Sequence, residues 1–232
     1  MSQTASDRLR TKLDFAYPTL RASSERIWSS PFVRELYPVY LSTMHGIVRT
    51  PVALMEAALG RARELAPDDD VAAGLVPYLA HHAPEEKGHD RWLLEDLEAL
   101  GGDPLEPLRR IPSAHVAAFV GAQYYWLHHH HPVALLGHMA VIEGYPPQVG
   151  FSERLRELTG YPAEAFRAIR RHERLDIRHR RELYEAIDRL PLRPEHETLI
   201  GISAFHTVRA AIDVFDEILA AVIEPAAVEV TG

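Results

Sequence analysis

The stretch PAEAFRAIRRHERLDIRHRRELYEAIDRL, residues 162–190, decides the fold that we expect for this chain. Pro162 stands where the first turn of a helix favours proline. Four apolar residues then continue one helical face in steps of three and four: Ile169, Leu183, Ile187 and Leu190. This spacing predicts an amphipathic helix with one buried side.

Three polar residues interrupt that apolar face. His172, Asp176 and His179 fall at i, i+4 and i+7, so all three project from the side that the pattern buries. A buried carboxylate between two imidazoles is costly unless it is paired or ligated. The face therefore favours a metal site.

Two other segments repeat this feature. Leu75 and Leu79 lead along one face to His82, Glu86 and His89. Glu86 and His89 form Glu-x-x-His, with the two ligand types one turn apart. In a third segment Glu143 shares a face with apolar residues, and proline follows shortly after it. Three segments thus each point a carboxylate inward, and two of them add histidines.

Together these positions predict a metal centre with six ligands: Glu86, His89, Glu143, His172, Asp176 and His179. Six donors are too many for one catalytic zinc, whereas three carboxylates with neutral imidazoles suit two divalent ions, iron or alternatively manganese. Each motif alone could be a satisfied core residue or a buried ion-pair network. Their joint occurrence on core-facing stripes favours the metal.

The rest of the chain has the same helical period, and no stretch shows the strict alternation of a strand. We expect an all-α protein with one domain over residues 1–232, in which Pro225 ends the last helix and 225–232 form a frayed tail. The expected helices number about seven: 5–28, 32–66, 69–100, 113–131, 132–158, 162–190 and 194–224. Internal prolines should kink several of them.

Composition excludes several classes of function. The 232 residues include no cysteine, so zinc fingers, iron–sulfur clusters and cysteine nucleophiles are ruled out. A formal charge of −8 argues against nucleic acid or an anionic membrane as partner. The N-terminal residues have no apolar signal region, and we find no apolar run long enough to span a membrane. We therefore expect a cytoplasmic protein, and a homodimer is left open.

The run HHAPEEKGHDRWLLEDL, residues 81–97, resembles the metal-binding helix of the haem-oxygenase-like diiron oxidases and oxygenases, also called iron-containing redox enzymes. Glu143 and the His172-x-x-x-Asp176-x-x-His179 motif are similar in order and spacing to that family's remaining ligands. The resemblance runs from the segment around His45 to about Leu190, which is most of the chain.

The resemblance implies a seven-helix haem-oxygenase-like fold and a nonhaem diiron centre that activates dioxygen. It implies N-oxygenation, oxidative decarboxylation or C–C cleavage of an amino acid or fatty acid, often in natural-product biosynthesis. It also implies that one iron, held more firmly, uses the first four of the six ligands, and that Asp176 and His179 help to hold a labile second iron. Whether Glu56 or His45 contributes is left open.

The apolar stripes beside these ligands suit an aliphatic body, and arginine, which dominates the basic residues, could hold a carboxylate head group. We therefore expect a small carboxylate-bearing substrate, dioxygen as co-substrate and an external electron donor. No nucleotide-binding loop is present. The alternatives are a metal-free thiaminase-like or pyrroloquinoline-quinone-synthase-like enzyme of the same fold, or a metal-storage protein. Storage is disfavoured because a ferritin-like site would carry two Glu-x-x-His motifs.

Overall fold

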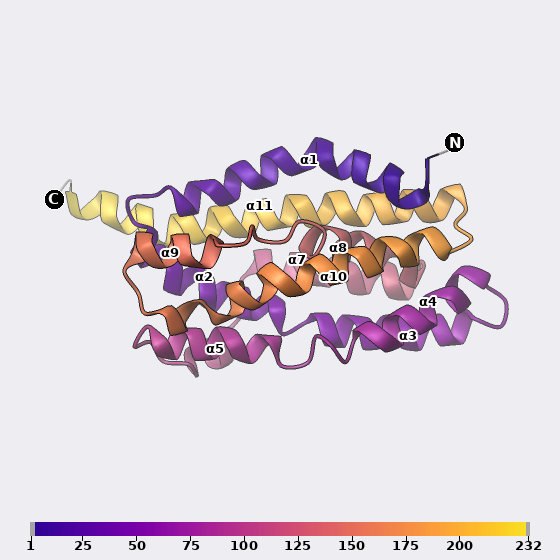
Figure 1. The fold of residues 1–232 in the computed structure, drawn as a ribbon, viewed down its shortest axis with the longest axis horizontal. Helices are drawn as coiled ribbons and strands as arrows, with labels where there is room; N and C mark the ends of the chain where they lie inside the picture. Colours follow the sequence, from indigo (N-terminus) through magenta and orange to yellow (C-terminus); the bar gives the residue numbers. More distant parts are fainter. Residues whose placement is uncertain (1–2, 231–232) are drawn as a thin grey trace.

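The chain folds into an elongated bundle of helices (Figure 1). The computed structural model describes residues 3–230, and these contain no strand, which confirms the all-α class. The helices are α1 (Ala5–Trp28), α2 (Val33–Val48), α3 (Pro51–Leu65), α4 (Asp70–His82), α5 (His89–Ala99), α6 (Glu106–Arg109), α7 (Ala114–His129), η1 (Pro132–Ala134), α8 (Leu135–Ile142), α9 (Phe151–Thr159), η2 (Ala163–Phe166), α10 (Arg167–Arg189) and α11 (Pro194–Val230).

Two long helices form the spine of the bundle. α1 and α11 run side by side in the same direction along the molecule, with α3 and α4 at one end and α2 and α5 at the other (Figure 1). α8 crosses α11 so closely that a Cβ added to Gly137 would lie 2.1 Å from the carbonyl oxygen of Ile200. Only glycine fits at this crossing. Residues 194–223 of α11 have the length and hydropathy of a membrane span, so the expectation that no apolar run is long enough is wrong. Of the 18-residue window that meets this criterion, 44% is buried inside the bundle.

All seven expected segments are helical, and three of them are split. α2 and α3 separate before Pro51, α4 and α5 separate around Pro84, and α8 is separated from α9 by a turn that includes Pro146 and Pro147. Proline lacks the N–H that the preceding helical turn needs, which explains these breaks. Pro225 does not end the last helix as expected, because α11 continues to Val230. Residues 231–232 of the expected frayed tail lie outside the described residues.

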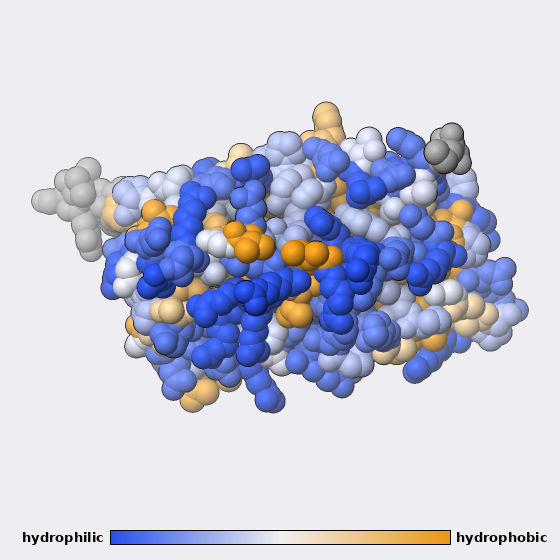
Figure 2. All heavy atoms as spheres, in the orientation of Figure 1, coloured by the Kyte–Doolittle hydropathy of each residue, from blue (hydrophilic) through white to orange (hydrophobic). Residues whose placement is uncertain are grey.

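The apolar core consists of two clusters that share α10. Ile169 belongs to one cluster and Leu183 to the other. Between these two residues the buried positions of α10 are polar, and they include Asp176 and His179. The polar segment therefore lies at the junction of the two apolar clusters. The outer surface of this part of the molecule is largely hydrophilic, with a blue band that follows α10 (Figure 2).

Candidate metal centre

The break between α4 and α5 carries part of the centre. α4 ends at His82 and α5 begins at His89, with Pro84 in the turn between them and Gly88 in the left-handed conformation at φ 87°. Glu86 lies in this turn, so the single continuous helix that we expected here is wrong. The turn nevertheless keeps the pair together, because Glu86 Oε2 lies 2.9 Å from His89 Nδ1.

α10 presents the second group of ligands on one face, as the spacing predicts. Asp176 and His179 are buried and His172 is half-buried. The Nδ1 of His172 lies 2.8 Å from the carbonyl oxygen of Ala168, to which it donates. In that tautomer the other ring nitrogen, Nε2, keeps its lone pair for a ligand.

The start of α10 is fixed by a residue of α5. Asp96 is fully buried, and its carboxylate accepts hydrogen bonds from the backbone N–H groups of Arg167 at 3.0 Å and Ala168 at 2.9 Å. Burial raises the pKa of Asp96 to about 6. The capping bonds tie α10 to α5, the helix that begins with His89.

Glu143 arrives from a third direction, at the C-terminal end of α8. Its Oε1 lies 3.3 Å from His82 Nε2. The turn that follows Glu143 leads to α9, whose first N–H groups are held by the buried Glu173: the carboxylate accepts from Gly150 at 3.1 Å and from Ser152 at 2.7 Å. The sequence did not single out Glu173, which follows a predicted ligand directly.

Glu86 lies at the middle of the group. Besides His89, its carboxylate reaches the His179 Nδ1 at 3.3 Å and the His82 Nε2 at 3.8 Å. The rings of His89 and His172 are 5.2 Å apart. The structure thus brings the predicted residues of α4–α5, α8 and α10 to one place.

The electrostatics of the site are those of crowded, buried carboxyl groups. Burial, followed by the charges of Glu143 and Glu86, raises the pKa of Asp176 to about 8. Burial also raises the pKa of Glu143, and it lowers the pKa of His179 to about 4. The pKa of Glu86 is lowered, because its contact with His89 outweighs burial, and the pKa of His82 is raised, because its contact with Glu143 outweighs burial. Several carboxyl groups buried in one place are costly unless cations balance them.

Two residues close to the group were not among the predicted ligands. His82 is fully buried and contacts Glu143, and Glu85 lies 3.6 Å from His179 through its Oε2. His82 stands four residues before Glu86 on the apolar stripe of its segment, and that position could have indicated it. Glu85 has no such signal, because the turn that places it is absent from a continuous helical pattern.

Unsatisfied atoms show that the residues fit a metal. Among the described residues, the buried atoms Glu143 Oε2 and His179 Nδ1 have no hydrogen-bond partner. Buried polar atoms are rarely left unpaired, and each one costs about 1–3 kcal/mol. Divalent iron or manganese accepts this mixture of carboxylate and imidazole donors. The donor set therefore fits the metal that the sequence predicts.

A cavity of about 600 Å³ reaches the centre from one side. Four of the predicted ligands line it: Glu86, Glu143, His172 and Asp176. Most of the remaining wall is apolar, with residues such as Leu93, Phe119, Ile169, Val214 and Phe215. A volume of this size falls within the roughly 300–1,000 Å³ typical of small-molecule sites.

Three arginines also line the cavity. Arg21 and Arg154 are exposed, and Arg154 lies 3.9 Å from Glu25. Arg180 is half-buried, and among the described residues no ion pair or hydrogen bond of its side chain is found. It stands one helical turn beyond Asp176. Arg180 is therefore a free cation in the cavity wall.

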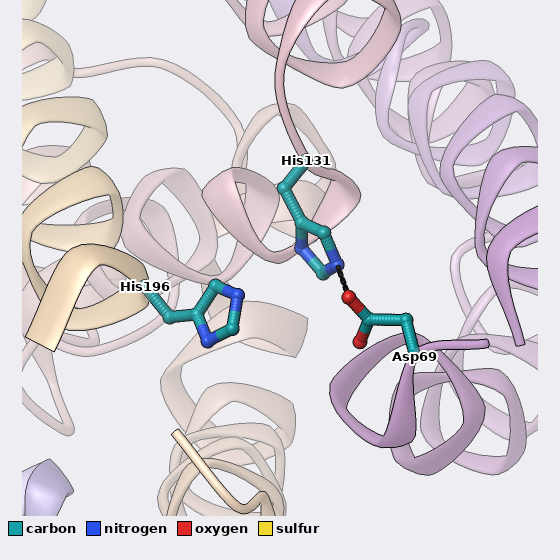
Figure 3. Close-up of side chains that lie close together, drawn as sticks. All are labelled: Asp69, His131 and His196. Atoms are coloured by element: carbon teal, nitrogen blue, oxygen red, sulfur yellow. Dashed lines mark ion pairs between the residues drawn. The ribbon is translucent and has the colours of Figure 1, made fainter. Parts of the chain in front are cut away.

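A second cluster, formed by Asp69, His131 and His196, lies elsewhere (Figure 3). The Nδ1 of His131 accepts a hydrogen bond from the N–H of Val133 at 3.1 Å, so its Nε2 carries the proton and faces Asp69 at 3.5 Å. The Nδ1 of His196 accepts from the Arg193 backbone at 3.2 Å. These histidine tautomers do not suit a metal. The cluster instead caps the starts of three helices, since Asp69 accepts from the first turn of α4.

The two residues left open by the sequence differ in burial. Glu56 is exposed on α3 and lies away from the group. His45 is buried on α2, with both ring nitrogens lacking a hydrogen-bond partner among the described residues. Neither belongs to the residues that line the cavity.

Comparisons with known proteins bear on the family and the fold. A sequence profile described as iron-containing redox enzyme matches residues 47–212. No curated protein matches significantly. The chain is similar to a solved domain of unknown function with a heme oxygenase-like fold from Shewanella denitrificans (18% identity, 91% of this chain and 92% of that one, TM-score 0.72).

Two further solved structures are also similar. One is a CADD-like protein of unknown function from Nostoc punctiforme (16% identity, 84% of this chain and 85% of that one, TM-score 0.64). The other is a TenA homolog from Pseudomonas syringae pv. tomato (9% identity, 90% and 91%, TM-score 0.62). At these identities the likeness shows the fold alone, and it confirms the expected haem-oxygenase-like fold.

Proposed function

We propose that this chain, which belongs to the family of iron-containing redox enzymes, is a nonhaem diiron enzyme that uses dioxygen to oxidise a small carboxylate-bearing substrate. The observation that carries the proposal is the meeting of buried carboxylates and histidines at the wall of an apolar cavity. Such a wall places a bound organic molecule directly beside the metal ligands.

The residues that would hold the metals are Glu86, His89, Glu143, His172, Asp176 and His179. Two ferrous ions, when bound, would supply the electrons and the open coordination positions with which dioxygen is activated. Glu86 is the best candidate for a shared carboxylate, because its two oxygens face different histidines, His89 at 2.9 Å and His179 at 3.3 Å. Electrons for repeated turnover would come from a donor outside the chain.

The cavity would orient the substrate by its two ends. Its apolar wall excludes water and holds an aliphatic body, while Arg180 offers two N–H groups to a carboxylate head. Because Arg180 and Asp176 lie one turn apart on α10, the head group would be anchored beside the metals rather than on them. The bond to be oxidised would then lie a short distance along the chain from the carboxylate.

The metal-free alternative has less support. The likeness to a TenA homolog concerns the fold, at 9% identity. An enzyme that works without metal has no use for Glu86, Glu143 and Asp176 crowded in one buried site, where each carboxylate raises the energy of the others. The diiron assignment gives these residues a role.

Iron loading under anaerobic conditions tests the proposal. We expect about two ferrous ions per chain, and substrate-dependent oxygen consumption when amino acids and medium-chain fatty acids are added one at a time to the reduced protein. His89→Ala should lose iron, whereas His131→Ala, in the capping cluster, should bind it normally. Less than one iron per chain, unchanged in His89→Ala, would refute the metal centre. Oxygen uptake triggered only by non-acidic compounds would refute the substrate class.

A further inference from the structure

We propose that His82 is a ligand of the second metal position, together with His179, and that Glu85 positions both rings from behind. This inference rests on the proposed diiron centre and extends its ligand set by one histidine. The six ligands predicted from the sequence include neither His82 nor Glu85.

The imidazole rings of His82 and His179 each turn one nitrogen toward the carboxylates at the middle of the site. His82 Nε2 lies 3.3 Å from Glu143 Oε1 and 3.8 Å from Glu86 Oε1. His179 Nδ1 lies 3.3 Å from the same Oε1 of Glu86. The two rings meet edge to face with centroids 4.5 Å apart.

The separations of these donors are those of ligands on a common ion. Two donors each about 2.1 Å from one metal lie at most about 4.2 Å apart. The His82 nitrogen satisfies this limit with both Glu86 and Glu143. Its ring is held in place by the aromatic ring of Tyr78, with centroids 5.5 Å apart. The ring is fully buried, and the group that faces its unpaired Nδ1 is the carboxylate of Glu85, at 3.9 Å.

The opposite nitrogens of both rings turn toward a single carboxylate. Glu85 Oε2 lies 3.9 Å from His82 Nδ1 and 3.6 Å from His179 Nε2. Its other oxygen, Oε1, is held at 2.9 Å by Arg178, which also approaches His179 Nε2 at 3.3 Å. A carboxylate behind a metal-bound histidine accepts its remaining N–H and fixes the tautomer in which the inner nitrogen is free to bind. Glu85 is placed to do this for His82. At His179 the Nε2 also lies 3.3 Å from the Arg178 guanidinium, which only donates, so Glu85 accepts the Nε2–H of His179 once that contact is released.

A simple hydrogen bond from His82 to Glu143 is the competing role, and the two roles predict different spectra. In the Co(II)-loaded protein each ligating histidine gives one strongly shifted, solvent-exchangeable N–H proton resonance. With two Co(II) bound we expect four such signals, from His82, His89, His172 and His179. If His82 only orients Glu143, three signals are expected. The spectrum of the unaltered protein decides, whatever a variant does to folding.

Variants assign the signals. His82→Asn should remove one signal and weaken binding of the second Co(II), whereas His138→Asn should leave all four. His138 is a matched control because it is also buried, with its Nδ1 3.1 Å from Thr207 Oγ1. Glu85→Gln should keep four signals but weaken the binding of the second Co(II) by about 10–100-fold. Loss of a group that hydrogen-bonds to a metal ligand has an effect of this size.

The outcomes separate this inference from the function on which it rests. Two bound Co(II) with three signals would overturn the role of His82 and leave the diiron centre intact. Fewer than two bound Co(II) would overturn both. Unchanged affinity in Glu85→Gln would overturn the positioning role of Glu85.

Discussion

Replacing Asp176 with asparagine should stabilise the metal-free protein at neutral pH. Burial and the neighbouring Glu143 and Glu86 raise the pKa of Asp176 from an ordinary value of 3.8 to about 8. The unfolded chain releases this proton near pH 4, whereas the folded chain keeps it to about pH 8. Since the folded pKa is the higher one, stability from this group is complete below about pH 4 and is lost as the pH rises toward 8.

The size of the effect follows from the number of pH units between the ordinary pKa of Asp176 and the pH of the experiment. Each pH unit corresponds to about 1.4 kcal/mol, so at pH 7 the rise from 3.8 costs up to about 4 kcal/mol. Asparagine is similar in shape and carries no charge, so Asp176→Asn should recover about 2–4 kcal/mol at pH 7 and almost nothing at pH 4. For a chain of 232 residues this gain raises the melting temperature by roughly 5–15 °C.

Urea unfolding of the metal-free protein at several pH values measures this gain. Asp188→Asn is the control, because Asp188 lies on the same helix but at the surface, where it accepts two hydrogen bonds from Ser6 at 2.8 Å. It should show no such stabilisation. With saturating Co(II) the unaltered protein should become more stable to urea than Asp176→Asn, since the variant lacks a metal ligand. A gain that is the same at pH 4 and pH 7, or no gain, would refute the reasoning.

Three further predictions concern the frame, the cavity and the capping cluster. Gly137→Ala should destabilise the protein by about 3 kcal/mol or more in urea, because its Cβ would lie 2.1 Å from the Ile200 oxygen; Gly121→Ala, with nothing within 4 Å, should be neutral or stabilising. Arg180→Gln should raise KM for a carboxylate substrate by about 10–100-fold at unchanged iron content; an unchanged KM would remove its anchoring role. His131→Ala should cost about 1 kcal/mol in thermal unfolding and leave the Co(II) stoichiometry intact; a lost metal would contradict its structural role.

The sequence was sufficient for the class of fold and for the ligands that follow helical spacing. His172, Asp176 and His179 lie on one uninterrupted helix, so the 3.6-residue period placed them on one face. Glu143 was found in the same way, since it ends a helix whose apolar face it continues.

The turn between α4 and α5 escaped prediction. A continuous helical period hid the break at Pro84, and with it the positions of Glu85 and Glu86. Proline ended the helix there, although Pro38 and Pro77 lie inside continuous helices. Whether a proline breaks a helix depends on tertiary contacts, which a single sequence does not contain. The capping role of Asp96 was not predicted for a related reason: the helix that it caps begins 71 residues further along the chain.

The site comes near the surface at the cavity and also at Glu85, and we expect this to bear on the order in which metal and substrate arrive. The apolar cavity opens onto Glu86, Glu143, His172 and Asp176, but Glu85 is not part of its wall. Glu85 is 23% exposed and reaches His82 and His179 from behind. An ion arriving past Glu85 does not have to cross the space that an organic molecule fills. Metal exchange can then proceed with substrate already in the cavity, and excess substrate should neither trap the ion nor slow its uptake.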